Sequence, residues 1–214
     1  DASKNVVIKV HASSVNPVDK ILLSGDLKLV FPVAEFPHVI SYDVAGVVEK
    51  ADSKGVFSVG QPVFARVWSD VDDDKKTPWF RGTMAEFCVA RTSDVVTKPD
   101  NISFEEAASI PLAGMTAFQV LKESGLKEGD SVFISGGAGG VGTMAIQLAK
   151  HVFKAGLVVT TASKGEKMDL CKSLGADEVL DYKSESFVTV YGNDDSTKFD
   201  VCFDTTAEGL EMVK

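Results

Sequence analysis

Residues 130–150 read DSVFISGGAGGVGTMAIQLAK, and this stretch decides the fold. A short β-branched and aromatic run, Ser131–Ser135, precedes a burst of glycines, and a periodic apolar segment follows them. This order predicts a strand, a tight turn and a helix. In that context the spacing Gly137-x-Gly139-x-x-Gly142 is typical of a dinucleotide-binding turn.

Each glycine of this turn has a physical reason. Gly137 permits the turn, Gly139 lets the backbone approach a pyrophosphate, and Gly142 lets the helix pack closely on the strand. The start of the helix offers free N–H groups and the positive end of its dipole to phosphates. A structural glycine turn without a ligand is the alternative, and the flanking strand and helix favour dinucleotide binding.

The composition narrows the class of protein. With 214 residues, 44% of them hydrophobic and 25% charged, the chain fits a globular protein of one large or two modest domains. A net charge of −9 argues against a nucleic-acid or anionic-membrane partner. The three cysteines have no metal-ligand spacing, which favours a reduced compartment. No apolar run approaches the roughly 20 residues of a membrane span.

The ends of the chain predict truncation on both sides. The chain begins at Asp1 without a methionine, and it ends at Lys214 in the pattern of a starting helix. Any targeting segment is therefore expected outside it. The cytoplasm and the lumen of a chloroplast or another organelle both stay open as locations.

Residues 1 to about 98 have the pattern of a β-rich domain. Short strands separated by turn signals, typical of a compact barrel or a twisted sheet, are predicted at 6–10, 44–50, 61–68, 84–90 and 95–98. Asn16-Pro17 opens a short helix that Gly25 ends. The acidic run Ser69–Lys76 is interpreted as a solvated loop rather than a calcium site.

From Ser103 the pattern becomes helical and then alternates. Ser103 and Glu106 form a capping box ahead of an alanine-rich helix, and a break at Pro111 precedes a second helix at about 114–123. Strands are then predicted at 132–135, 157–161, 178–180 and 199–203, with helices near 140–151 and 165–174. This alternation predicts a parallel sheet with the fourth strand beside the first, and at least two strands of a full doubly wound sheet are missing.

The tip of the second of these strands indicates which dinucleotide binds. An NAD-binding domain places an Asp or Glu there, for the ribose 2′-hydroxyl. Here that tip carries Ser163 and Lys164, with Lys167 one turn on. Cations and hydroxyls suit a 2′-phosphate. The lysines could be ordinary surface residues, but the helix dipole disfavours cations in a first turn, so the pattern favours NADPH over NADH.

Further motifs carry a resemblance over nearly the whole chain. They are Asn16–Asp19 (NPVD), Tyr42–Val48 (YDVAGVV), Gly82–Phe87 (GTMAEF), Ala107–Ala117 (AASIPLAGMTA), Gly136–Gly142 (GGAGGVG), Gln147–Phe153 (QLAKHVF) and Ser173–Tyr182 (SLGADEVLDY). On them the chain resembles the zinc-independent, quinone oxidoreductase-like branch of the medium-chain dehydrogenase/reductase superfamily, and most of all its plant-type 2-alkenal reductases and enone oxidoreductases. The resemblance implies an α/β chain with a GroES-like catalytic domain at 1–118, whose C-terminal return segment is absent, and an incomplete NADPH-binding Rossmann domain at 119–214.

The resemblance also implies site residues. Cofactor binding would involve, besides the three glycines above, Thr116 near the nicotinamide, Gly140 and Val141 at the pyrophosphate, and Ser163, Lys164, Lys167 and Tyr182 around the 2′-phosphate and adenine. Asn16 would line the active cleft. Lys20 is a weaker cleft candidate, because it comes one residue before the family's lysine position, and one residue turns a helix by about 100°.

Zinc is not expected. The resemblance places Tyr42-Asp43 where zinc-dependent relatives carry a His-Glu pair, and Asn16 where they carry a cysteine. Three scattered cysteines cannot supply a four-cysteine structural site. His11, His38 and His151 are interpreted as structural or exposed residues.

The functional hypothesis is hydride transfer. NADPH would deliver hydride to the C=C bond of an α,β-unsaturated aldehyde or ketone, and water would protonate the α-carbon, so the site needs orientation more than a strong base. An NADPH quinone reductase is one alternative, and a non-catalytic NADPH-binding interaction protein is another. The fragment alone could be inactive. The expected partner is a small enone, enal or quinone, with no nucleic acid and no membrane, and a homodimer stays open.

Overall fold

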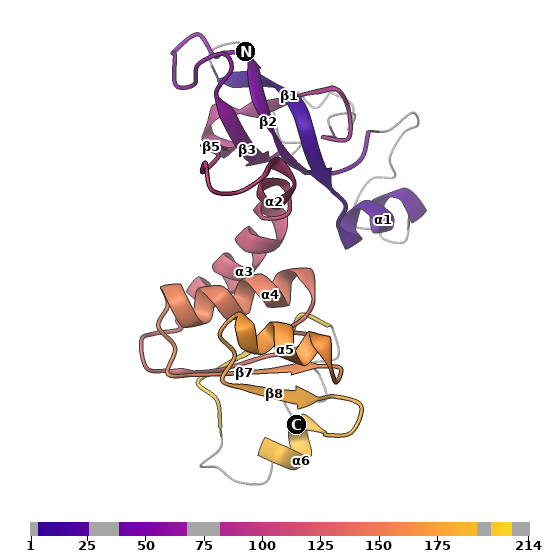
Figure 1. Ribbon diagram of the computed structural model, residues 1–214, viewed down its shortest axis with the longest axis vertical. Coiled ribbons are helices and arrows are strands. Elements are labelled where there is room, and N and C mark those ends of the chain that lie inside the picture. Colours follow the sequence, from indigo (N-terminus) through magenta and orange to yellow (C-terminus); the bar gives the residue numbers. More distant parts are fainter. Residues whose placement is uncertain (1–3, 26–38, 68–81, 192–197, 207–214) are drawn as a thin grey trace. The chain divides into compact units, whose positions relative to one another are not determined.

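The computed structural model describes residues 4–25, 39–67, 82–191 and 198–206 (Figure 1). The chain divides into two compact units, residues 1–112 and 113–214. The predicted loop at 69–76 and His38 lie outside the described residues. Among the helices of the described ranges, none has both the length and the apolar character needed to span a membrane. The predicted domain boundary after residue 118 stays a prediction.

Unit 1 is built on an antiparallel sheet of five strands in the order β4-β1-β2-β3-β5. Its elements in chain order are β1 (Asn5–Ser14), α1 (Pro17–Ser24), β2 (Asp43–Lys50), β3 (Pro62–Arg66), β4 (Phe87–Arg91), η1 (Thr92–Asp94), β5 (Val95–Thr97) and α2 (Phe104–Ala108). All five predicted strands are confirmed, with shifted ends. The first extends to Ser14 because two register shifts, at Val7/Ile8 and Val10/Ala12, keep it paired with β2 along its length.

The predicted helix signals of unit 1 act as expected. Gly25 ends α1 with a φ of 72°, the left-handed conformation that glycine adopts without strain. The capping box before α2 is confirmed: the Glu106 N–H donates to Ser103 Oγ at 3.1 Å, and the Ser103 N–H donates to Glu106 Oε2 at 2.7 Å. The predicted break between two helices is confirmed, because α2 ends at Ala108 and α3 (Pro111–Glu123) begins at Pro111, three residues earlier than predicted. Proline fits a first helical position, since it has no N–H to leave unpaired there.

Unit 2 holds a parallel sheet in the order β8-β7-β6-β9. Its elements after α3 are β6 (Ser131–Ile134), α4 (Gly140–Gln147), the π-helical turn η2 (Leu148–Val152), β7 (Leu157–Ala162), α5 (Glu166–Ser173), β8 (Glu178–Asp181), α6 (Phe187–Tyr191) and β9 (Val201–Phe203). The fourth predicted strand, β9, pairs with the first, β6, in parallel, which confirms that predicted neighbour relation. The short helix α6 is an addition that the sequence pattern did not predict.

The two faces of this sheet are covered differently. Figure 1 shows α4 and α5 on one side of β7 and β8, and α6 on the other. Successive residues of β6 point to opposite faces, so Val132 and Ile134 join the helix-covered core while Phe133 packs on Phe187 at a ring distance of 4.0 Å. With both faces covered, the carboxyl ends of the strands and their turns form the edge where ligands bind in such sheets.

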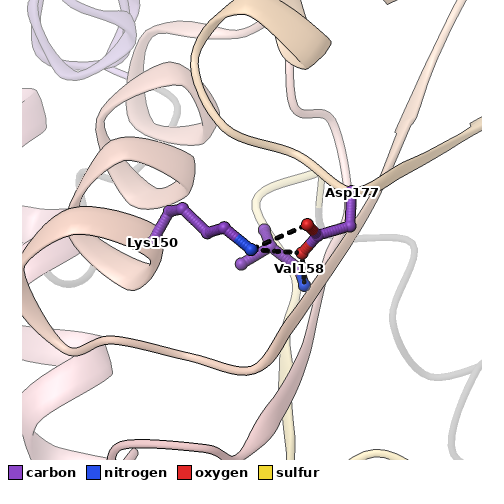
Figure 2. Close-up of polar contacts among 3 residues, drawn as sticks. All are labelled: Lys150, Val158 and Asp177. Atoms are coloured by element: carbon purple, nitrogen blue, oxygen red, sulfur yellow. Dashed lines mark hydrogen bonds and ion pairs between the residues drawn. The ribbon is translucent and has the colours of Figure 1, made fainter.

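An ion pair links the middle of η2 to the residue before β8. Lys150 Nζ lies 2.7 and 2.9 Å from the two carboxylate oxygens of Asp177, and Asp177 also accepts the backbone N–H of Val158 at 2.8 Å (Figure 2). Both charged side chains are about one-third exposed, at 30% and 34%. Solvent therefore screens the ion pair, and the bond to the backbone of β7 is the stronger anchor.

Candidate functional site

A cavity of about 850 Å³ crosses the carboxyl ends of all four parallel strands. Its walls come from the turn after β6, the end of β7, the start of α5, the turn after β8, the start of α6 and the residues after β9. They are Ser135, Gly136, Ala138, Gly139, Thr161, Ala162, Ser163, Lys167, Tyr182, Lys183, Ser184, Glu185, Ser186, Phe187, Thr205 and Thr206. The volume is within the usual range for a small-ligand pocket, and the position is the ligand-binding edge of an α/β sheet.

The glycine turn needs glycine at two of the predicted positions for lack of space. A Cβ on Gly137 would lie 2.2 Å from Thr160 Oγ1, and a Cβ on Gly142 would lie 2.2 Å from the carbonyl oxygen of Gly136. Gly140, by contrast, has open space around it. The glycine with a left-handed backbone is Gly136, at φ 65°, one residue before the predicted fingerprint. Close packing of α4 and β7 on the turn thus excludes side chains.

Hydrogen bonds to β7 hold the turn in place. Gly136 donates its N–H to Thr161 Oγ1, and Gly137 donates to the carbonyl of Thr161, both at 2.9 Å. Helix α4 then begins at Gly140 with Gly139 as its N-terminal cap. The N–H groups of a first turn have no acceptor within their own helix, so they suit an anion such as a pyrophosphate.

The cavity has a basic end near α5 and β8. Three of the residues proposed from the sequence, Ser163, Lys167 and Tyr182, line it there, and Lys183 lines it as well. The two residues that follow β7, Ser163 and Lys164, are not acidic. Glu185 is the acidic residue among the cavity residues named above, and its Oε2 accepts the backbone N–H of Asp181 at 3.0 Å. This donor set fits an extra phosphate on a ribose.

At the opposite end, hydroxyl groups join the tips of β6 and β9. Asp204 accepts hydrogen bonds from Ser135 Oγ and, at 2.9 Å each, from the N–H and Oγ1 of Thr206. Thr205 Oγ1 donates to the carbonyl of Ser135 at 2.7 Å. These bonds fix the turns that close this end of the cavity.

The structure gathers some predicted residues and separates others. Gly139, Ser163, Lys167 and Tyr182 meet on the cavity wall. Five more lie next to these residues in sequence, in the turns or in the first turn of α4, and are not wall residues: Gly137, Gly140, Val141, Gly142 and Lys164. Thr116 lies on α3 and is not a wall residue.

Sequence reasoning missed Lys183 and the pair Thr205-Thr206. Each had a signal, because Lys183 follows Tyr182 directly and the threonines follow a predicted strand at its carboxyl end.

In unit 1, Asn16 belongs to a buried polar cluster. Asp43, 1% exposed, accepts Ser14 Oγ at 2.6 Å, Asn16 Nδ2 at 2.8 Å and the backbone N–H of Leu112 at 2.8 Å. Burial raises the pKa of the Asp43 carboxyl above its ordinary value, against the effect of these three hydrogen bonds. The carboxylate therefore holds the Asn16 amide and the first turn of α3 together.

The second cleft candidate, Lys20, is placed differently. On α1 the buried residue is its neighbour Asp19, which accepts the N–H groups of Asn16 and Ser41 at 2.7 and 2.8 Å. Lys20 itself is exposed. Tyr42 is half-buried, and burial, followed by the nearby charge of Asp19, raises its pKa.

Metal ligands do not gather in the part of the chain that the structure describes. Within it, no group of three or more His, Cys, Asp or Glu side chains could hold a metal ion. Cys88 and Cys171 are buried free thiols, and Cys202 is exposed. The absence of a metal stays a prediction for the protein as a whole.

Comparison with known proteins agrees with this architecture. The alcohol dehydrogenase GroES-like domain model matches residues 2–100, and the zinc-binding dehydrogenase model matches residues 140–212. The chain is 42% identical to 2-methylene-furan-3-one reductase of Solanum lycopersicum, over 98% of this chain and 51% of that protein. It is 40% identical to the chloroplastic NADPH-dependent alkenal/one oxidoreductase of Arabidopsis thaliana, over 98% of this chain and 52% of that protein. The chain belongs to the medium-chain dehydrogenase/reductase superfamily, in its quinone oxidoreductase-like branch.

The structure of this medium-chain dehydrogenase/reductase is also similar to solved ones. The quinone oxidoreductase from Coxiella burnetii matches with a TM-score of 0.70 and 34% identity, over 88% of this chain and 56% of that one. The predicted fold class, a GroES-like domain with a Rossmann-type parallel sheet, is confirmed. The chain spans about half the length of the curated relatives it matches.

Proposed function

We propose that this chain forms part of an NADPH-dependent oxidoreductase that transfers hydride to the C=C bond of an α,β-unsaturated aldehyde or ketone. The observation that carries the proposal is the cavity over the strand tips, with a glycine turn at its centre and a basic end. The two relatives named above support the substrate class, because their names describe a furanone reductase and an alkenal/one oxidoreductase. The GroES-like domain at 1–118 would serve catalysis, and 119–214 would bind the cofactor.

The residues present fit NADPH. Gly137 and Gly142 bring the backbone of the turn close to β7 and α4, and the first N–H groups of α4, from Gly140 and Val141, would face the pyrophosphate. Lys167, Ser163 and Tyr182 line the end where the ribose 2′-phosphate would lie. Thr205 and Thr206 would face the nicotinamide half, with Thr116 as a further candidate near the ring.

The chemistry supplied by bound NADPH is a hydride, and the chain's own residues orient the reactants. In unit 1 the Asn16 amide is held by Asp43 at 2.8 Å, so it is preorganised to line a substrate cleft. No strong base is required, because water can protonate the α-carbon of the reduced substrate. The acceptor is a small molecule rather than a nucleic acid or a membrane. This function is compatible with a monomer and with a homodimer. It is also compatible with a location in the cytoplasm or in an organelle.

The test is NADPH oxidation by the complete protein, followed by absorbance, with a small alkenal, a cyclic enone and a quinone as acceptors. Turnover with the alkenal or the enone is the expected result. Turnover with quinones alone would reassign the protein as a quinone reductase, the second candidate, which the similarity to the Coxiella burnetii enzyme favours. Tight NADPH binding without oxidation of any acceptor would instead support a non-catalytic, NADPH-binding interaction protein. The exposed Lys20, which comes one residue before the family's lysine position, favours that alternative.

A further inference from the structure

The turn after β8, residues 181–186, forms one wall of the cavity. Five consecutive residues of it line the cavity: Tyr182, Lys183, Ser184, Glu185 and Ser186. Two backbone bonds shape the turn, since the N–H groups of Ser184 and Glu185 donate to the carbonyl of Asp181 at 3.0 and 2.8 Å. Lys183 therefore lines the cavity from a closed, hydrogen-bonded turn.

The carboxylate of Asp181 accepts two further hydrogen bonds from residues of this turn. Its Oδ1 accepts the backbone N–H of Lys183 at 3.2 Å, and its Oδ2 accepts the hydroxyl of Ser184 at 3.0 Å. The backbone N–H of Lys164 also donates to it. Asp181 thus ties the turn after β8 to the residues after β7, which include Ser163. These hydrogen bonds, first of all the one from Lys183, lower the pKa of Asp181.

Two lysine residues line the same end of the cavity. Lys167 comes from the first turn of α5, and Lys183 comes from the turn after β8. The hydroxyls of Ser163, Ser184 and Tyr182 lie on the same wall. A phosphate monoester carries close to two negative charges at neutral pH, so two lysines match it better than one. A ribose with a free 2′-hydroxyl carries no charge there and gains no charge–charge attraction from the second lysine.

We propose that Lys183 is a second cofactor-discriminating lysine, which binds the phosphate monoester on the adenosine ribose, and that Asp181 is the positioning residue that holds its turn in place. This inference rests on the proposed function, because it concerns the same cofactor pocket. The positioning role explains how the carboxylate of Asp181 can lie next to an anion site. Asp181 accepts its hydrogen bonds from the Lys183 N–H and the Ser184 hydroxyl, within the turn.

The test is calorimetric binding of 2′,5′-ADP and 5′-AMP to the complete protein, since these two probes differ in the monoester. Lys183→Met is expected to weaken 2′,5′-ADP binding about tenfold and to leave 5′-AMP binding unchanged. Lys183→Arg should keep most of the affinity. Lys172→Met is the matched control, because Lys172 is an exposed lysine of α5 outside the cavity wall, and it should change neither probe.

The role of Asp181 is tested by whether its substitution strengthens or weakens 2′,5′-ADP binding. If its charge mattered only through repulsion of the phosphate, both Asp181→Asn and Asp181→Ala would strengthen 2′,5′-ADP binding. A positioning role predicts that Asp181→Ala weakens it several-fold, while Asp181→Asn, which keeps an acceptor for the Lys183 N–H, binds at least as well as the parent. In the Asp181→Ala background the effect of Lys183→Met should shrink, because the lysine is no longer held.

The outcomes separate this inference from the proposed function. A parent protein that binds 2′,5′-ADP no tighter than 5′-AMP would overturn the NADPH assignment together with the role of Lys183. A parent that prefers 2′,5′-ADP, with Lys183→Met equal to it, would overturn the role of Lys183 alone. Thermal unfolding of each variant excludes loss of the fold as the cause of weaker binding.

Discussion

The amide nitrogen of Asn16 lies 2.8 Å from the carboxylate of Asp43, a residue that follows it by 27 positions. The same carboxylate accepts the N–H of Leu112, at a separation of 69 positions. One buried charge thus joins the segment before α1 to the first turn of α3. Because both segments depend on Asp43, this residue gives the clearest stability predictions.

Asp43→Ala is expected to lower the free energy of unfolding by about 2–4 kcal/mol, because it leaves three donors in a buried place without their acceptor. Urea unfolding measures the change. Asp100→Ala is the control, since Asp100 is exposed, and it should stay within about 0.5 kcal/mol of the parent. An Asp43 variant as stable as this control would contradict the role given to the cluster.

The pH dependence of Asp43 has a definite sign. Burial raises its pKa in the folded state above the ordinary 3.8, so the folded protein binds more protons than the unfolded chain between the two values. The stability of the parent relative to Asp43→Asn should therefore be highest below the unfolded pKa and fall as the pH rises through the folded pKa. Unfolding curves of both proteins from pH 4 to pH 7 measure this difference, and a rise with pH would contradict it.

Ser41 is a non-glycine residue in a left-handed conformation, with φ 76°. Its hydroxyl donates to the carbonyl of Ser14 at 2.5 Å and accepts from Thr83 Oγ1 at 2.8 Å. Ser41→Ala loses these bonds and keeps the strain, whereas Ser41→Gly loses the bonds and relieves the strain. Both should destabilise, and the glycine variant should be the more stable of the two by about 1 kcal/mol. Equal urea unfolding midpoints for Ser41→Ala and Ser41→Gly would show that the left-handed conformation at residue 41 does not lower stability.

Alanine substitution at two of these glycines should have opposite effects on stability. Gly137→Ala would place a Cβ 2.2 Å from Thr160 Oγ1, and we expect a loss of more than about 2 kcal/mol of stability. Gly140→Ala meets nothing within 4 Å at a helical position, and it should be neutral or stabilising by up to about 1 kcal/mol. Thermal unfolding of the matched pair decides. Similar losses for both variants would contradict the packing argument.

The ion pair in Figure 2 predicts unequal costs for its two ends. Lys150→Met should cost at most about 1 kcal/mol, because the pair is partly exposed. Asp177→Ala should cost about 1–2 kcal/mol more, because the N–H of Val158 then loses its acceptor. The double variant should be no less stable than Asp177→Ala alone. Urea unfolding of the three variants tests this order.

Local signals carried most of the fold prediction. The capping box of Ser103 and the terminal Gly25 depend only on neighbouring residues, and both are confirmed. Alternation and turn residues also placed every strand within a few positions. The errors occur where distant contacts decide, as in β1, whose extension to Ser14 depends on bulges against β2. Helix α6 is five residues long, too short for a periodic pattern, and it is held by packing of Phe187 on Phe133.

The sequence located the part of the site that lies directly after predicted strands. Ser163, Lys167 and Tyr182 follow strands that the alternation had located, and all three line the cavity. The contacts of Asp43 were not predictable, because Ser14 and Leu112 reach it from positions 29 before and 69 after it. Only the folded sheet brings such residues together.

The π-helical turn at Leu148–Val152 has a consequence for chain length. A π-helix holds more residues per turn than an α-helix, so this turn contains extra chain that an α-helix would not need. Removing one residue would allow ordinary helical spacing, but it would rotate Lys150 by about 100°, away from Asp177. A deletion at 148–152 would therefore be felt 27 residues further along, at the start of β8. The number of residues before Lys150 in this turn therefore determines whether its side chain reaches Asp177.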